Sequence, residues 1–165
     1  MASLKYGCIE PGGVKTIEVP VAASQFFYHN GVNAVHLDGS GNATLSLTAT
    51  GTIYGIAVVP ACRGAGSSDA YWKSSATAGA DKIAVIPVSA GAMFCFPADD
   101  TVTAAMRGNA CDLIAVNDGT ATQVDVGTSS TDIFLIVDLA TNLKSTASAT
   151  DVIVKINPAK VQADT

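Results

Sequence analysis

Side chains that could carry acid–base or metal chemistry are few in this sequence. Its 165 residues contain two histidines and four cysteines. His29 and His36 stand seven residues apart, and neither lies in a His-Glu-x-x-His motif or another spacing that holds zinc. The cysteines are widely spaced and form no Cys-x-x-Cys pair. We therefore expect neither a metal site nor a redox motif.

Three short motifs look like functional sites, and each fails at a definite position. Residues 39–41 read Gly-Ser-Gly, which lacks the Gly-x-Ser-x-Gly spacing of a hydrolase nucleophile. The glycine-rich residues 64–68 are followed by no Gly-Lys-Ser/Thr, so they do not form a phosphate loop. Residues 38–42 resemble the start of a calcium loop, but Ala43 replaces its glycine and its final Glu is missing. We expect no catalytic residue and no cofactor, and hence a protein that is not an enzyme.

Composition and charge exclude further classes. The formal net charge is −5, and the nine basic residues form no cluster. A nucleic-acid partner is not expected, since binding phosphate backbones requires a concentrated basic face. No apolar run reaches the roughly 20 residues that cross a bilayer, so a membrane partner is not expected either. The first residues lack the apolar stretch of a signal peptide.

The cysteines indicate where the chain is made. Without a secretion signal, Cys8, Cys62, Cys95 and Cys111 are expected to be reduced thiols in a reducing cytoplasm, with Cys95 buried among apolar neighbours. A disulfide between two of them stays open as the alternative.

Alternating apolar and polar residues predict strands. Residues 43–50 alternate small or apolar side chains with hydroxyls, which gives one core face and one polar face. Residues 17–21 alternate in the same way, and Pro20 indicates an edge strand. Three further predicted strands are apolar on both faces, as in the centre of a sheet: 54–59, 82–87 and 133–137. Two more alternate apolar and polar residues: 124–126 and 152–156.

Frequent turn residues separate these strands. Asn117-Asp-Gly119 predicts a hairpin between residues 113–116 and 123–126. A helix is least excluded at residues 99–107, for two turns at most. The sequence therefore predicts an all-β fold, an antiparallel β-sandwich, jelly roll or small β-barrel with at most one or two short helices. No internal repeat is visible.

The chain divides into an N-terminal arm at residues 1–13, one β domain at residues 14–157 and a C-terminal tail at residues 158–165. Residues 63–80 are rich in Gly, Ser and Ala and are expected to form a long loop. Within it, Tyr71 and Trp72 are either exposed contact anchors or aromatic side chains that pin the loop to the core.

The segments 54–59, 108–114, 117–119, 123–127, 133–138 and 151–157 resemble the capsid decoration proteins of tailed phages, also called cement or head-stabilisation proteins. The composition, rich in Ala, Gly, Thr and Val with little Glu, is similar to theirs. The resemblance covers mainly the last sixty or so residues.

This resemblance implies a virion structural protein on the capsid exterior that binds the major capsid protein, as a homo-oligomer with a trimer favoured. It implies that the N-terminal arm contacts the capsid protein, which would place Leu4, Tyr6 and Pro11 at that interface. Tyr71, Trp72 and Arg107 are the further expected contacts, since Tyr, Trp and Arg often anchor interfaces. The alternatives are another virion β module (head fibre, tail or receptor-binding) and a carbohydrate-binding module.

Overall fold

The structure is a computed structural model, and it describes residues 7–9, 15–46, 52–59, 71–88, 91–115, 122–142 and 147–162. The predicted all-β class is confirmed, because strands form antiparallel sheets throughout this part of the chain. Helical structure in the same ranges is limited to 3₁₀ turns, at Val88, Ala104–Met106, Ala140–Asn142 and Pro158–Lys160. No helix among the described residues has the length and apolar character needed to cross a membrane.

Five strands form a first closed sheet, which we call the first barrel. Its order is β2-β8-β6-β4-β5. The end strands meet where Val21 bridges Ala43, and Ala22 donates its backbone N–H to the carbonyl of Ala43 at 3.0 Å. The strands are β2 (Ile17–Pro20), β4 (Ala34–Leu37), β5 (Ala43–Leu45), β6 (Gly55–Val58) and β8 (Lys82–Pro87).

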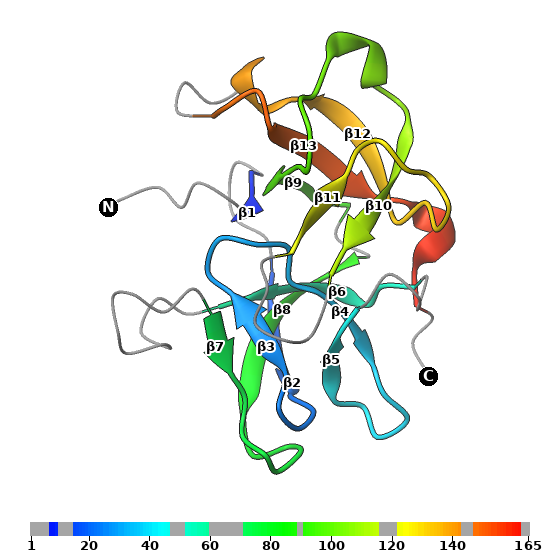
Figure 1. Cartoon of the computed structure of the whole chain (residues 1–165). Coiled ribbons are helices and arrows are strands. Elements are labelled where there is room, and N and C mark those ends of the chain that lie inside the picture. Colours follow the sequence, from blue (N-terminus) through cyan, green and yellow to red (C-terminus); the bar gives the residue numbers. More distant parts are fainter. Residues whose placement is uncertain are drawn as a thin grey trace.

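A second closed sheet, the second barrel, follows in the chain and lies above the first in Figure 1. Its strands are ordered β9-β13-β12-β10-β11. Here Ala98 bridges Val124, and Asp99 donates its N–H to the Val124 carbonyl at 2.9 Å. The strands are β9 (Met93–Pro97), β10 (Ala110–Ile114), β11 (Gln123–Asp125), β12 (Phe134–Leu139) and β13 (Asp151–Ile156).

The two barrels share one topology. If the five strands of each barrel are numbered in chain order, their order in the sheet is 1-5-4-2-3 in both barrels. A parallel bridge then joins the third strand to the first in both. The fold is thus a tandem of two five-stranded barrels, although no repeat is apparent from residue types along the sequence.

Further segments attach to the two barrels. β3 (Phe26–Tyr28) and β7 (Tyr71–Lys73) pair as a two-stranded ribbon beside the first barrel. β1 (Gly7–Cys8) pairs with β9, so the strand nearest the N-terminus belongs to the second barrel. At the other end, Val161 bridges Ile53 and the Gln162 side chain bonds to Leu37, so residues predicted as a tail attach to the first barrel.

Apolar residues on both faces of the central strands are explained by the two barrels packing together. On β4, β6 and β8, one set of side chains (Val35, Ala57, Val85) points into the first barrel. The alternate set (Ala34, Ile56, Ile86) joins the core cluster of the second barrel. Each of these strands therefore buries apolar side chains in both cores, and the two cores lie back to back.

The strand predictions agree with the structure where it describes them. β5 keeps the predicted alternation, although residues 47–50 lie outside the described part. β2 is an edge strand, as Pro20 predicted. β10 and β11 pair antiparallel as a hairpin would, while its turn at residues 117–119 is not described.

Two local predictions need correction. The expected loop at residues 63–80 contains β7, because Tyr71–Lys73 finds β-pairing partners in β3, which are distant in sequence. The short helix expected at residues 99–107 is reduced to the 3₁₀ turn at Ala104–Met106.

A close approach of β6 and β8 requires glycine at position 55. A Cβ on Gly55 would overlap the backbone carbonyl of Ile86 and lie 2.6 Å from Cγ1 of Val85. We expect Gly55→Ala to lower the free energy of unfolding by about 1–3 kcal/mol, because backbone cannot yield as a side chain can. Gly39→Ala is the control, since nothing lies within 4 Å of its Cβ position. Urea denaturation of both variants checks this, and equal stabilities would contradict the assigned packing.

Candidate functional site

The β3–β7 ribbon carries a concentration of aromatic residues. Its register pairs Phe26 with Lys73, Phe27 with Trp72 and Tyr28 with Tyr71. Because side chains alternate along a strand, the central pair points one way and the two outer pairs point the other way. The ribbon therefore has an inner and an outer face of different character.

The inner face anchors the ribbon. Phe27 is fully buried in the core of the first barrel, and Trp72 packs against the same cluster. The two rings stack with centroids 5.5 Å apart and planes 22° apart. Large aromatic contacts of this kind fix the ribbon to the barrel at low cost in conformational entropy.

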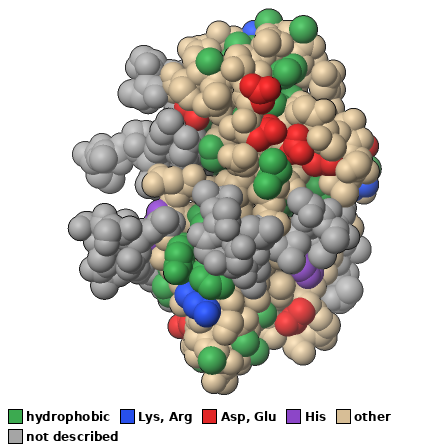
Figure 2. Space-filling model, in the orientation of Figure 1, with side chains coloured by type: hydrophobic (Ala, Val, Ile, Leu, Met, Phe, Trp, Pro, Cys, Tyr) green, Lys and Arg blue, Asp and Glu red, His purple; other side chains and the backbone are tan. Residues whose placement is uncertain are grey.

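The outer face presents the rings of Tyr71 and Phe26 beside a positive charge, whereas Tyr28 on the same face is buried. Tyr71 is 37% exposed, and its ring meets that of Phe26 at 5.0 Å in an edge-to-face arrangement. The ammonium of Lys73 lies 4.9 Å from the centroid of Phe26. Figure 2 shows hydrophobic side chains next to a basic one over this part of the first barrel. We call Phe26, Tyr71 and Lys73 the aromatic patch.

The structure separates the two aromatic residues that the sequence singled out. Tyr71 is exposed, as a contact residue would have to be, whereas Trp72 packs against the core, as the second reading predicts. Sequence reasoning did not find Phe26 and Lys73. The run Phe26-Phe27-Tyr28 was the available signal, but its pairing with β7 depends on a contact between distant segments.

Arg107 lies at the far end of the second barrel, away from the aromatic patch. Its guanidinium is exposed and bonds to the carboxylate of Asp138, with both Nε and one terminal nitrogen 2.7 Å from Oδ1. That bond, with others from Leu139 and Asn142, lowers the pKa of Asp138. Arg107 is thus held in place rather than brought together with Tyr71. Leu4, Tyr6 and Pro11 lie outside the described residues.

His36, Ser46 and Asp38 form the group closest in appearance to a catalytic triad. Nδ1 of His36 lies 3.4 Å from Oγ of Ser46, and burial lowers the pKa of His36 despite the nearby Asp38 carboxylate. However, Ser46 is only 1% exposed and its hydroxyl also lies 3.4 Å from the Thr52 carbonyl. A nucleophile must reach the substrate, so this arrangement serves structure.

Asp38 itself organises a plain turn. Its carboxylate accepts the backbone N–H groups of Ser40 at 2.8 Å and Asn42 at 2.9 Å, which is an Asx-type turn. The resemblance of residues 38–42 to a calcium loop therefore reflects turn geometry. No group of three or more potential metal ligands occurs among the described residues.

Asp112 occupies the place in the second barrel that corresponds to His36 in the first. Its carboxylate accepts four hydrogen bonds, from the N–H and Oγ of Ser130 and from the N–H groups of Thr131 and Asp132. Burial acts to raise the pKa of Asp112, but these bonds outweigh it and lower the pKa to about 2. One buried charge thus fixes the loop that leads into β12.

The described cysteines behave as thiols or as core residues. Cys95 is fully buried against Ala140 and Ile153, as predicted. Burial, together with nearby carboxylates, raises the pKa of Cys111 to about 12, so its thiol stays protonated. Cys8 is half-buried at the edge of the second barrel and is a free thiol. Cys62 lies outside the described residues.

Comparison of the chain with protein-family models, curated proteins and solved structures finds no match.

The two faces of the ribbon predict different costs for removing its aromatics. We expect Trp72→Ala to lower the free energy of unfolding by about 2–3 kcal/mol, because it leaves a cavity beside Phe27. Tyr71→Ala should cost about 1 kcal/mol or less, since only edge contacts are lost. Chemical denaturation measures both, and equal losses would contradict the inward and outward assignments.

Asp112 predicts a dependence of stability on pH. Its folded pKa of about 2 lies below its ordinary value of 3.8. The folded state therefore binds fewer protons in this window, so the stabilisation is complete above pH ~4 and is lost as the pH falls toward 2. We expect Asp112→Asn to cost about 2 kcal/mol at pH 7 and much less near pH 2. A gap between wild type and variant that stays constant with pH would rule this out.

Proposed function

We propose that this chain is a virion structural protein that binds the outer surface of a tailed-phage capsid and stabilises the shell. It acts through its surfaces rather than by catalysis. Its partner is the major capsid protein, and its own copies associate, with a trimer favoured. The chain is made in the cytoplasm of the host bacterium and ends in the virion.

The aromatic patch is the observation that carries the proposal. It combines an exposed tyrosine with a cation on a ribbon held rigidly by Phe27 and Trp72. Interface hot spots are rich in such residues, and a rigid support reduces the entropy lost on binding. The resemblance of the C-terminal segments to decoration proteins supports the same reading. So does the low charged fraction of 14%, which leaves surface available for contacts with other subunits.

Stabilisation follows from thermodynamic linkage. A protein that binds the assembled shell, but not its separated subunits, shifts the equilibrium toward the shell. Modest contacts repeated over many sites add through avidity. No chemical step is needed, which is consistent with the buried hydroxyl of Ser46 and the plain turn at Asp38.

A carbohydrate-binding module is the second candidate, and the observation that raises it is the exposed ring of Tyr71 beside the partly buried ring of Phe26. Sugars stack on flat aromatic faces. Here the two ring planes differ by 70°, and Lys73 lies over Phe26. This geometry suits a protein partner better than a sugar. A glycan array separates the two candidates, and the position of the protein in the virion separates a decoration protein from a fibre, tail or receptor-binding module.

The direct test is binding to expanded capsids of the phage that encodes the chain. We expect the purified protein to co-sediment with shells and to raise their disruption temperature. Tyr71→Ala should weaken binding by about 30-fold, which is the loss of a typical hot spot of about 2 kcal/mol.

Ser40→Ala serves as the matched control, because Ser40 is exposed on a turn of the same barrel and uses only its backbone in hydrogen bonding. Its binding should equal that of the wild type. Absence of any binding at micromolar concentration would overturn the proposed function.

A further inference from the structure

The two barrels correspond residue by residue, beyond their shared strand order. The pair Val19–Ile83 of the first barrel corresponds to Phe96–Val152 of the second. Ladder pairs elsewhere correspond in the same register: Ala34–Ile56 to Ala110–Leu135, Leu37–Ala43 to Leu113–Val124, and Ala57–Val85 to Ile136–Val154. One alignment therefore accounts for every ladder within the two five-stranded sheets, apart from a bulge between Ile136 and Asp138.

Hydrogen bonds outside the ladders follow the same alignment. Ala57 donates its N–H to the carbonyl of Asn33, and its counterpart Ile136 donates to Asn109. These two asparagines open the shared pattern Asn-Ala-x-x-Leu, at residues 33–37 and 109–113. Each barrel's first strand also ends in proline, at Pro20 and Pro97. The correspondence allows the same site to be compared in the two barrels.

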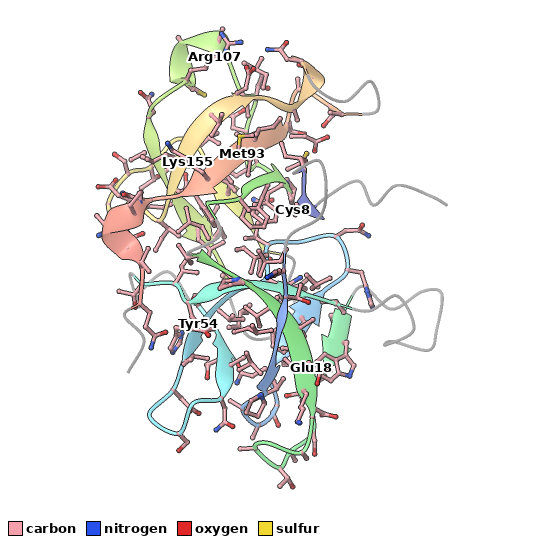
Figure 3. All side chains as sticks on the ribbon, turned by 180° about the vertical axis from the view of Figure 1, so that it is seen from behind. Cys8, Glu18, Tyr54, Met93, Arg107 and Lys155 are labelled. Carbon is pink, nitrogen blue, oxygen red and sulfur yellow. The ribbon has the colours of Figure 1, made fainter. Side chains whose placement is uncertain are left out.

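In the second barrel, the outer edge of the first strand is covered by β1. Gly7 and Cys8 pair with Cys95 and Phe94, and Ile9 donates its N–H to the carbonyl of Met93 at 3.0 Å. Cys8 packs against the core beside Phe94, which is only 2% exposed. Figure 3 labels Cys8 and Met93 at this edge.

In the first barrel, the corresponding edge is open among the described residues. Thr16 and Glu18 correspond to Met93 and Cys95, so their N–H and C=O groups face away from β8. The alternation confirms this direction, since Val21 bonds to Asp81 on the β8 side and Ala22 bonds to Ala43 on the other. Ile17 corresponds to Phe94, yet it is 40% exposed. An apolar position buried in one barrel is thus exposed in the other, where no described strand covers it.

We propose that the β2 edge at residues 15–19 is a strand-acceptor site, and that its occupant is an extended segment of the shell protein. This inference rests on the proposed function. Strand addition satisfies the main-chain groups that pair with no described strand and covers Ile17, as β1 covers Phe94 in the second barrel. If the β1 of a second copy filled this edge, the β9 edge of that second copy would be uncovered. Each copy has one β1 and two such edges, so exchange between copies cannot cover them all.

The edge also specifies the chemistry of the incoming strand. Opposite Ile17 the strand needs a small or medium apolar side chain, the role that Cys8 has opposite Phe94. On the outer side, the second barrel offers apolar Met93 and Cys95 to Ile9, whereas the first offers Thr16 and Glu18. The strand should therefore carry polar or basic residues on that side. Its apolar and polar side chains alternate.

Residue-resolved hydrogen exchange on the full chain, free and bound to expanded shells, tests the site. Binding is first measured by co-sedimentation. We expect the amides of Thr16 and Glu18 to exchange about tenfold or more slowly in the bound state. The amides of Ile17 and Val19 face β8 and should be protected in both states.

A pair of variants provides an independent measurement. Ile17→Lys places a charge at the edge and should weaken shell binding by about tenfold or more. Val161→Lys is the matched control, because Val161 is an apolar residue of similar exposure (39%) elsewhere on the first barrel, and it should bind normally. Thermal unfolding checks that both variants are folded.

The outcomes separate this inference from the proposed function. Suppose that the wild type binds shells but its Thr16 and Glu18 amides stay unprotected, or that Ile17→Lys binds as well as the wild type. Either result overturns the strand-acceptor site and leaves the proposed function intact. No shell binding by the wild type overturns both. Shell binding with protection at these two amides and loss in Ile17→Lys supports both.

Discussion

Main-chain closure of each five-stranded sheet is the constraint on which the rest of the molecule depends. A single pair of hydrogen-bonding segments, Ala22 to Ala43 in one barrel and Asp99 to Val124 in the other, joins the first strand to the third. Closure removes most of the free edges that an open sheet exposes. It also fixes which side chains point inward, because the side-chain direction alternates along every strand once the register is set. The core, the aromatic ribbon and the open part of β2 all follow from it.

The back-to-back apolar cores hold the two barrels together. Ala34, Ile56 and Ile86 leave the interior of the first barrel and enter the cluster that contains Phe94 and Phe134. Within the first barrel, Gly55 lets β6 and β8 approach closely. Since neither barrel retains a complete apolar covering without the other, we expect the chain to unfold as one cooperative unit.

Many of the strands could be predicted from the sequence, because their evidence is local, but five were missed: β1, β3, β4, β7 and β9. The alternation in β5, the proline of β2 and the apolar runs of β6, β8 and β12 each act within a few residues. The arrangement of these strands could not be predicted in this way. The pairing of β3 with β7, which decides that Trp72 is structural and Tyr71 is exposed, joins segments more than forty residues apart. The tandem repeat escaped notice because matching positions keep their strand pairing but mostly not their residue type, as His36 and Asp112 illustrate.

The two ends of the chain cross over between the barrels. β1 precedes the first barrel in sequence but pairs with the second, while Val161 and Gln162 follow the second barrel but bond to the first. A force that pulls the barrels apart is therefore resisted by main-chain hydrogen bonds at both ends, in addition to the apolar junction. Bonds loaded together yield at higher force than bonds loaded one after another. Complete separation of the two barrels therefore requires that both crossed ends be released, in addition to the apolar junction.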